Sequence, residues 1–236
     1  MTGTIINIIT IILGSLLGVL FGAKLPERVR ESVLSVLGLF TLGLGLSMFL
    51  QTENALLVLA ALLIGTLLGE WWRIEENLER FGETLKRRFA QRLGDRDLAR
   101  FVEGFLAASI LFCVGPMTIL GSIQDGLTGD YSLLATKAVM DGFASLAFAA
   151  TMGVGVAFSA VTVLIFQGGL SLLAGTLQGA ITTTMVNEMS AAGGIILMGI
   201  AIGNILGIRG IRSGNFLPAL FLAPLFAALA ELFLNL

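Results

Sequence analysis

Hydrophobic positions in this chain gather in long runs, and short polar breaks separate one run from the next. Each run is long enough to cross the roughly 30 Å hydrocarbon core of a bilayer as an α-helix. The pattern predicts eight spans: Ile5–Phe21, Val33–Leu50, Ala55–Trp72, Val102–Ile123, Leu133–Phe158, Val161–Leu177, Met189–Ile208 and Phe216–Leu234. We therefore expect an all-α fold, a polytopic transmembrane helix bundle of about eight spans.

Composition supports this class and narrows the chemistry. Apolar residues make up 56% of the chain and charged residues 13%, so we expect the lipid bilayer around it and no nucleic-acid partner. The single cysteine, Cys113, excludes an intrachain disulfide, and the absence of histidine removes the commonest transition-metal ligand and proton shuttle. Any proton handling therefore falls to carboxylates.

The sequence contains no convincing enzymatic constellation. It has no glycine-rich phosphate loop ending in Lys-Ser or Lys-Thr, no histidine-based metal motif and no serine with a plausible base partner. We therefore expect no enzyme activity, no catalytic residue and no cofactor, and the sequence leaves open whether a metal binds. Paired carboxylates such as Asp125 and Asp141 are the one arrangement that a membrane enzyme could use.

The placement of basic residues predicts how the spans are oriented. No basic leader precedes the first span, and Lys24, Arg28 and Arg30 follow it at once, which indicates a retained helix with its N-terminus outside. Alternation then puts every strongly basic loop on the cytoplasmic side. If the fourth span failed to cross, Arg209 and Arg212 would lie outside, so the charge pattern favours eight spans over seven.

The connection from residue 73 to residue 100 holds eight of the fourteen basic residues, interleaved with acidic ones. Apolar residues recur within it at three- and four-residue steps: Ile74, Leu78, Phe81, Leu85, Phe89 and Leu93. This spacing predicts an amphipathic helix on the inner leaflet. Two uses stay open: a plain linker between two halves, or a regulatory element that attracts anionic headgroups through Lys86, Arg87 and Arg88.

An acidic residue recurs at the same place in three membrane segments, as Glu31, Asp141 and Glu188. Serine, threonine and two glycines follow Glu31 and Asp141 at the same steps, and a fainter copy surrounds Glu188. We expect internal duplication, with membrane repeats at 1–72, 101–158 and 159–236, the first joined to the second by the connecting helix at 73–100. By the loop charges, the span with Glu31 runs outward and the other two run inward, so the repeats have inverted topology.

Asp141 is the strongest candidate for a binding carboxylate because it lies about ten residues, or about 15 Å, into its span. A charge at this depth is costly and marks a path for ions or polar solutes. Lys137 lies one turn earlier on the same helix face, where it either neutralises Asp141 structurally or forms a proton- or substrate-dependent switch with it. Glu31 and Glu188 lie nearer helix starts, where a carboxylate either favours the positive dipole end or acts as a gate.

The fourth span contains a predicted break. Pro116 removes a backbone donor, and Gly115 and Gly121 weaken the helix around it. The carbonyls freed there must face protein or a wet cavity. Polar side chains follow the break closely, at Thr118, Ser122, Gln124 and Asp125. They form either an ion-binding locus or a proline kink in which the hydroxyls bond back to the helix and Asp125 lies at the outer interface.

Small residues at four-residue spacing predict close helix packing. They occur in four series: Gly14, Gly18 and Gly22; Gly65 and Gly69; Gly175 and Gly179; Gly199 and Gly203. Packing within the bundle is the favoured use, and a homodimer face is the alternative. Gln167, in the middle of the sixth span, must find a hydrogen-bond partner inside the bundle.

The motif around the break resembles one family. The run Gly121-Ser122-Ile123-Gln124-Asp125-Gly126, followed by Asp130-Tyr131-Ser132 and by residues 137–142, is similar to the uncharacterised multipass bacterial inner-membrane proteins of the YdfK/YqgA type. The resemblance covers almost the whole chain, although Pro116 stands where a small residue is commoner. It implies a polytopic fold in a bacterial or archaeal plasma (inner) membrane. It implies no activity, because the family has no known function.

Together these features predict an integral membrane transporter or channel that moves a small cation or a polar solute. Asp141 and Asp125 are expected to bind the ion or proton. Their predicted partners are Gln124, Thr118, Ser122 and Lys137, and the predicted gates are Glu31 and Glu188. The alternative is a non-transporting structural or regulatory membrane protein whose basic amphipathic helix docks a cytosolic partner.

Overall fold

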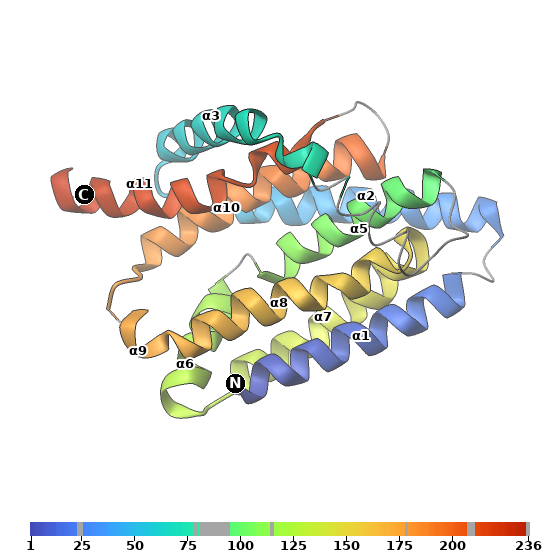
Figure 1. Cartoon of the computed structure of the whole chain (residues 1–236), viewed down its shortest axis with the longest axis horizontal. Coiled ribbons are helices and arrows are strands. Elements are labelled where there is room, and N and C mark those ends of the chain that lie inside the picture. The colour runs from blue at the N-terminus through green and yellow to red at the C-terminus, as the bar shows by residue number, and fades with distance from the viewer. Residues whose placement is uncertain are drawn as a thin grey trace. The chain divides into compact units, whose positions relative to one another are not determined.

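A computed structural model gives the fold, which is all-α in the part of the chain that it describes (Figure 1). The described residues are 1–22, 26–77, 80, 95–113, 116–177, 179–206 and 211–234. The predicted amphipathic helix lies largely outside them, and so do Lys86, Arg87 and Arg88. The chain forms two compact units, and each is described by itself.

Unit 1 comprises Met1–Leu37, Glu79–Cys113 and Met117–Gln178. Its elements are α1 (Thr2–Gly22), the first part of α2 (Glu27–Phe49), α5 (Asp95–Cys113), α6 (Pro116–Thr128), α7 (Ser132–Met152), α8 (Gly155–Leu172) and the short α9 (Ala174–Leu177). α1 buries a stripe of residues three or four positions apart, including Asn7, Ile11 and Gly14. Its other face exposes leucines and isoleucines, as a helix that faces lipid does.

Glycines bring α1 and α7 into backbone contact. A methyl group added at Gly14 would lie 2.2 Å from the carbonyl oxygen of Gly142, and one added at Gly22 would lie 2.1 Å from that of Ala150. No side chain fits at either position, so the two backbones can touch. The packing role predicted for the first glycine series is therefore confirmed.

The described residues contain seven helices that are long and apolar enough to cross a membrane, and eight if the bent pair α5–α6 is counted as one span. α1 and α7 run in the same direction, because Gly3 lies beside Leu134 at their starts and Gly22 lies beside Ala150 at their ends. Two spanning helices, α2 and α3, separate them along the chain before α5 and α6. α7 can start on the same side as α1 only if α5 and α6 together cross once, so the parallel pairing agrees with eight spans.

The predicted break lies between α5 and α6, whose axes differ by 59°. Pro116 is the first residue of α6, where its missing N–H would have no helical partner anyway. The hydroxyl of Thr118 donates to the carbonyl oxygen of Phe112 over 2.9 Å. This bond satisfies one of the acceptors that the end of α5 leaves free. The broken helix is thus confirmed.

The predicted span Leu133–Phe158 extends past the real helix end. α7 stops at Met152, and α8 begins at Gly155. Gly153 between them has a φ of +80°, a conformation that glycine adopts without strain and that ends a helix. The apolar run continues through this turn. Hydropathy alone therefore placed the boundary between the fifth and sixth spans too late along the chain.

Unit 2 comprises Gly38–Leu78, Val114–Pro116 and Gly179–Leu236. Its elements are the rest of α2, α3 (Ala55–Trp72), α10 (Thr183–Ile200), the π-helical turn η1 (Ala201–Ile205), the 3₁₀ turn η2 (Ser213–Phe216) and α11 (Ala219–Leu234). Asn54 caps the start of α3 by accepting a hydrogen bond from the backbone N–H of Leu56.

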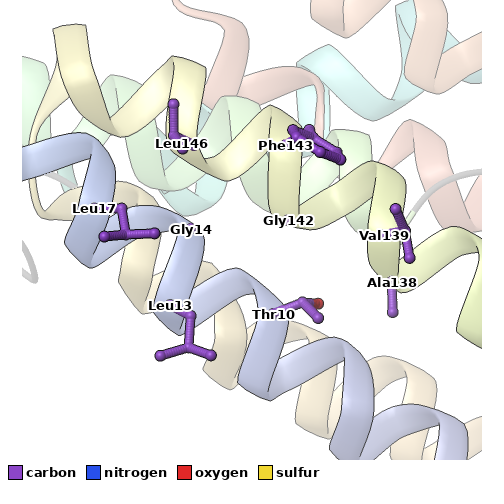
Figure 2. Close-up of a pocket in the computed structure, with 9 residues that line it drawn as sticks. All are labelled: Thr10, Leu13, Gly14, Leu17, Ala138, Val139, Gly142, Phe143 and Leu146. Atoms are coloured by element: carbon purple, nitrogen blue, oxygen red, sulfur yellow. The ribbon is translucent and has the colours of Figure 1, made fainter. Parts of the chain in front are cut away.

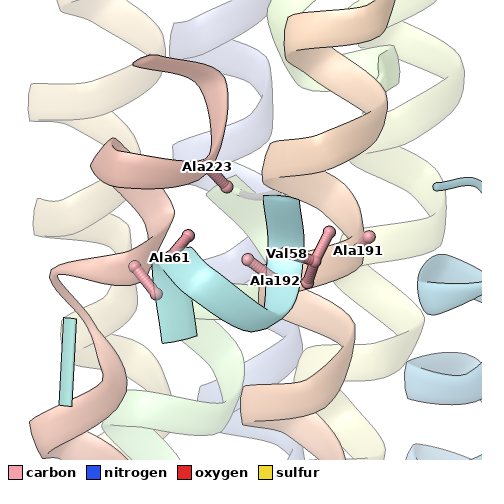
Figure 3. Packing of buried hydrophobic residues seen from close by; sticks show 6 residues of the cluster. Val58, Ala61, Ala191, Ala192 and Ala223 are labelled. Atoms are coloured by element: carbon pink, nitrogen blue, oxygen red, sulfur yellow. The ribbon is translucent and has the colours of Figure 1, made fainter. Parts of the chain in front are cut away.

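Small side chains form the core of unit 2. The cluster consists of Val58 and Ala61 from α3, Ala191 and Ala192 from α10, and Ala219 and Ala223 from α11 (Figure 3). A methyl group added at Gly69 would lie 2.0 Å from the carbonyl oxygen of Asn215, and one at Gly65 would lie 2.6 Å from the backbone nitrogen of Ala219. The second glycine series therefore packs as predicted.

The third glycine series differs. A methyl group added at Gly175, in unit 1, would meet no atom of the described structure within 4 Å, so that glycine is not a packing contact.

Candidate functional site

Asp141 lies in the middle of α7 and forms an ion pair with Lys137, one turn earlier on the same helix. Both side chains are buried, with 8% of each side-chain surface exposed. The pair carries no net charge, which lowers the cost of placing either charge in a membrane-spanning helix. The Ser145 hydroxyl donates to the backbone carbonyl of Asp141 over 2.7 Å, so it does not occupy the carboxylate.

A chain of amide groups connects the pair to α1 and α8. The Asn7 Nδ2 group donates to Asp141 Oδ2 over 2.9 Å and to Gln167 Oε1 over 3.0 Å. Gln167 Nε2 then donates to the hydroxyl of Thr4 over 3.2 Å. The residues Thr4, Asn7 and Gln167 are fully buried. The predicted need of Gln167 for an intrabundle partner is therefore confirmed.

The helix break adjoins the ion pair. The Lys137 ammonium lies 5.7 Å from the centre of the Phe112 ring, within cation–π range. The buried thiol of Cys113, the last residue of α5, interacts electrostatically with both Lys137 and Asp141. The end of α5 carries the negative pole of its helix dipole, which favours a nearby ammonium. Unit 1 thus brings together two features that the sequence suggested separately, the intramembrane carboxylate and the end of α5, after which the span is broken.

Asp125 contacts the start of α1 rather than the Lys137–Asp141 pair. Its Oδ2 accepts a hydrogen bond from the backbone N–H of Gly3 over 3.1 Å and forms an ion pair with the amino group of Met1 over 3.0 Å. Its Oδ1 is buried without a partner in the described structure. A carboxylate at this position satisfies free N–H groups of α1 and complements the positive end of its dipole.

The other polar residues near the break bond locally. The Thr118 hydroxyl donates to the backbone carbonyl of Phe112, and the Ser122 hydroxyl donates to the backbone carbonyl of Thr118. Gln124 donates to Asp130 Oδ2 over 2.7 Å in the turn before α7. The backbone N–H of Ser132 holds the pKa of the Asp130 carboxyl below its ordinary value. These hydroxyls and this amide therefore stabilise the break and the turn, and they do not point to one common ligand.

Glu31 and Glu188 occupy different environments. Glu31 is exposed on α2, and Ser35 donates to its backbone carbonyl over 3.0 Å. Glu188 is fully buried in unit 2, where it accepts hydrogen bonds from the backbone N–H groups of Glu53 and Asn54 and from the Thr52 hydroxyl. Glu188 thus caps the N-terminus of α3, a different helix from its own.

A shallow apolar groove of about 280 Å³ lies along the seam of α1 and α7 (Figure 2). Thr10, Gly14 and Gly142 line it together with exposed leucine, valine and phenylalanine side chains. It therefore suits lipid tails and not a polar solute. The described residues contain no group of three or more acidic, cysteine or histidine side chains placed to hold a metal ion.

Sequence reasoning missed Asn7 and Thr4. Both lie in the apolar first span, where an isolated polar side chain is a usable signal because it must find a partner inside the bundle. Their spacing of three residues places them on one face of α1. The face itself could not be assigned without knowing which helices pack against α1.

An all-α chain with seven or eight membrane-spanning helices and a buried charge pair inside one of them is a polytopic α-helical membrane protein. The chain belongs to the family described as "Protein of unknown function (DUF554)", whose family model matches residues 2–228. The resemblance proposed from the central motif is therefore confirmed.

Two relatives match the chain over nearly its whole length. It is 31% identical over 228 residues to "Uncharacterized membrane protein YdfK" of Bacillus subtilis (strain 168), covering 95% of this chain and 94% of that protein. It is 33% identical over 227 residues to "Uncharacterized protein YqgA" of Escherichia coli (strain K12), covering 96% of each. No solved structure matches the chain.

Proposed function

We propose that this protein is a transporter or channel that moves a small cation or a polar solute across the membrane, with Asp141 as the binding carboxylate. The observation that carries the proposal is the buried Lys137–Asp141 pair beside a broken helix, reached by polar side chains from α1 and α8. Charge inside a membrane-spanning bundle is costly and marks a transport pathway by default. Broken helices serve the same purpose, because their free ends can hold ions.

In this proposal the protein spans a bacterial or archaeal plasma membrane with its N-terminus outside. The predicted inverted repeats would let two similar segments exchange conformations and open a central site to either side in turn. Asp125 and Glu188 take part as helix caps whose release would free α1 and α3.

The test is a current measurement on proteoliposomes adsorbed to a solid-supported membrane, with stepped concentrations of protons, sodium, potassium and divalent cations. We expect one ion to evoke a current that Asp141→Asn abolishes. Glu76→Gln is the matched control, because it removes an exposed carboxylate that lies after the end of α3 and outside the predicted site. Tracer uptake of the same ions covers electroneutral exchange, which gives no steady current. If neither assay detects any ion with the wild-type protein, cation transport by this site is ruled out.

A further inference from the structure

We infer that the ion bound by Asp141 is the proton, and that Lys137 is the counter-ion whose contact with Asp141 the proton breaks. This inference rests on the proposed function, since it names the ion that the same site takes. It also gives the Lys137–Asp141 pair a role that a purely structural ion pair would not have.

The donors around Asp141 favour a proton over a metal ion. Both hydrogen bonds that its carboxylate accepts from Lys137 and Asn7 end on Oδ2, so two nitrogen donors already point at the group. A metal ion needs several oxygen ligands and would be repelled by these hydrogens. The described residues contain no group of three or more acidic, cysteine or histidine side chains that could form such a set. A proton needs one oxygen lone pair, and Oδ1 supplies it.

Asn7 provides an acceptor for the protonated state. Its Oδ1 is buried and has no hydrogen-bond partner in the described structure, although its Nδ2 already contacts Asp141. A buried acceptor without a partner costs free energy. A protonated Asp141 gains an O–H donor, and rotation of the Asn7 amide, which gives up the Nδ2 bond to Gln167, would let Oδ1 accept it. The charged and the protonated forms of Asp141 thus each find a complementary group on Asn7.

Lys137 has a second environment ready when Asp141 loses its charge. Its ammonium lies 5.7 Å from the centre of the Phe112 ring, at the end of α5 where the helix dipole is negative. Protonation of Asp141 removes the ion pair and leaves these weaker attractions to hold the ammonium. The charge state of α7 is thereby coupled to the end of α5, where the broken span bends.

Few other ionisable groups face the pair. α1 contributes Asn7 and no ionisable side chain, and α8 contributes Gln167 and none. On α5 Cys113 is buried next to Phe112, whose ring lies 5.7 Å from the Lys137 ammonium, whereas Glu103 lies ten residues earlier, about 15 Å along the helix. Asp125 of α6 is engaged by the start of α1. A proton that enters this region therefore finds Asp141 as its nearest carboxylate.

Infrared difference spectroscopy of the protein in proteoliposomes, between mildly alkaline and mildly acidic pH, tests the inference. We expect a carboxylic-acid C=O band to appear on acidification in the wild-type protein, to be absent in Asp141→Asn and to persist in Glu31→Gln. Lys137→Met removes the charge that favours the carboxylate, so Asp141 should take up its proton at a pH about one to three units higher. Lys137→Arg keeps the charge and should stay close to wild type.

The results separate this inference from the proposed function. A spectrum without any band that Asp141→Asn removes overturns the proton assignment, and so does a Lys137→Met variant that titrates like the wild type. If an ion current lost in Asp141→Asn accompanies such a spectrum, the transport function stands with a different ion. If the band is present but no ion or proton moves in proteoliposomes, Asp141 binds a proton and the transport function is the part that fails.

Discussion

Removing one member of the Lys137–Asp141 pair is expected to cost more stability than removing both. Either single change, Lys137→Met or Asp141→Asn, leaves one buried charge without its partner, which typically costs roughly 3–5 kcal/mol. The double variant leaves no charge, so its loss of unfolding free energy should be smaller than either single loss and well below their sum. Unfolding in detergent at a pH where Asp141 is charged measures all three.

A control variant and the additivity of the losses decide how the comparison of the single and double variants is interpreted. Glu31→Gln serves as the control and should change the unfolding free energy little, because Glu31 is exposed. Strictly additive losses would show that Lys137 and Asp141 do not act as a pair. If the double variant regains stability but does not move ions, the structural contribution of the pair is separate from its proposed role in transport.

At the residue scale, the sequence was informative about which side chains are buried and much less so about their partners. Asp141, Lys137 and Gln167 could be identified because a charge or an amide within an apolar span must be satisfied internally. The partners of Asp125 and Glu188 could not, because each caps a helix that is distant in sequence. Packing of the whole unit decides which two helices contact each other, and a local sequence pattern does not carry that information.

At the scale of helices, the seam between α1 and α7 makes a sharp prediction. Gly14→Ala places a methyl group 2.2 Å from the carbonyl oxygen of Gly142, so the helices must separate, at a cost of roughly 1–3 kcal/mol. Gly169→Ala on α8 is the matched control, since an added methyl group there meets no described atom within 4 Å. It should gain up to roughly 1 kcal/mol from helix propensity. Thermal unfolding in detergent compares the two, and equal effects would contradict close packing at Gly14.

The cap on α3 gives a second prediction at this scale. Glu188→Ala removes the acceptor for the N–H groups of Glu53 and Asn54 and for the Thr52 hydroxyl. A buried donor left without a partner costs roughly 1–3 kcal/mol. We therefore expect faster amide hydrogen exchange at the start of α3 and a lower unfolding temperature. Glu231→Ala, which removes one bond to Thr182, is the milder control, and unchanged exchange at α3 in Glu188→Ala would refute the cap.

Helix positions themselves were predictable where a polar or charged break bounded the apolar run, and unpredictable where none did. Asn54 marks the start of α3 because its side chain can cap a helix. The turn between α7 and α8 has only Gly153 and Val154 inside a continuous apolar run. Gly153 is one of 30 glycines in the chain, so its positive φ could not be predicted from composition or spacing.

At the scale of the whole molecule, the number of spans fixes on which side each loop lies. The positive-inside pattern and the parallel pairing of α1 and α7 both indicate that α5 and α6 together cross the membrane once. A re-entrant α5–α6 pair would instead leave the chain on the side from which it entered. The two topologies therefore differ in where the turn before α7 is exposed.

Cysteine labelling distinguishes the two topologies. Cys113 is the single cysteine and is buried, so Cys113→Ser supplies a background without any thiol. Gln51→Cys lies before the break and reports the outer side under either topology if the N-terminus is outside. With eight spans, a membrane-impermeant maleimide added to intact cells should label Tyr131→Cys together with Gln51→Cys, and Arg212→Cys only after permeabilisation. With seven spans, the results for Tyr131→Cys and Arg212→Cys exchange. Because the comparison with Gln51→Cys is relative, it decides whether the broken span crosses even if the absolute orientation is the reverse of the predicted one.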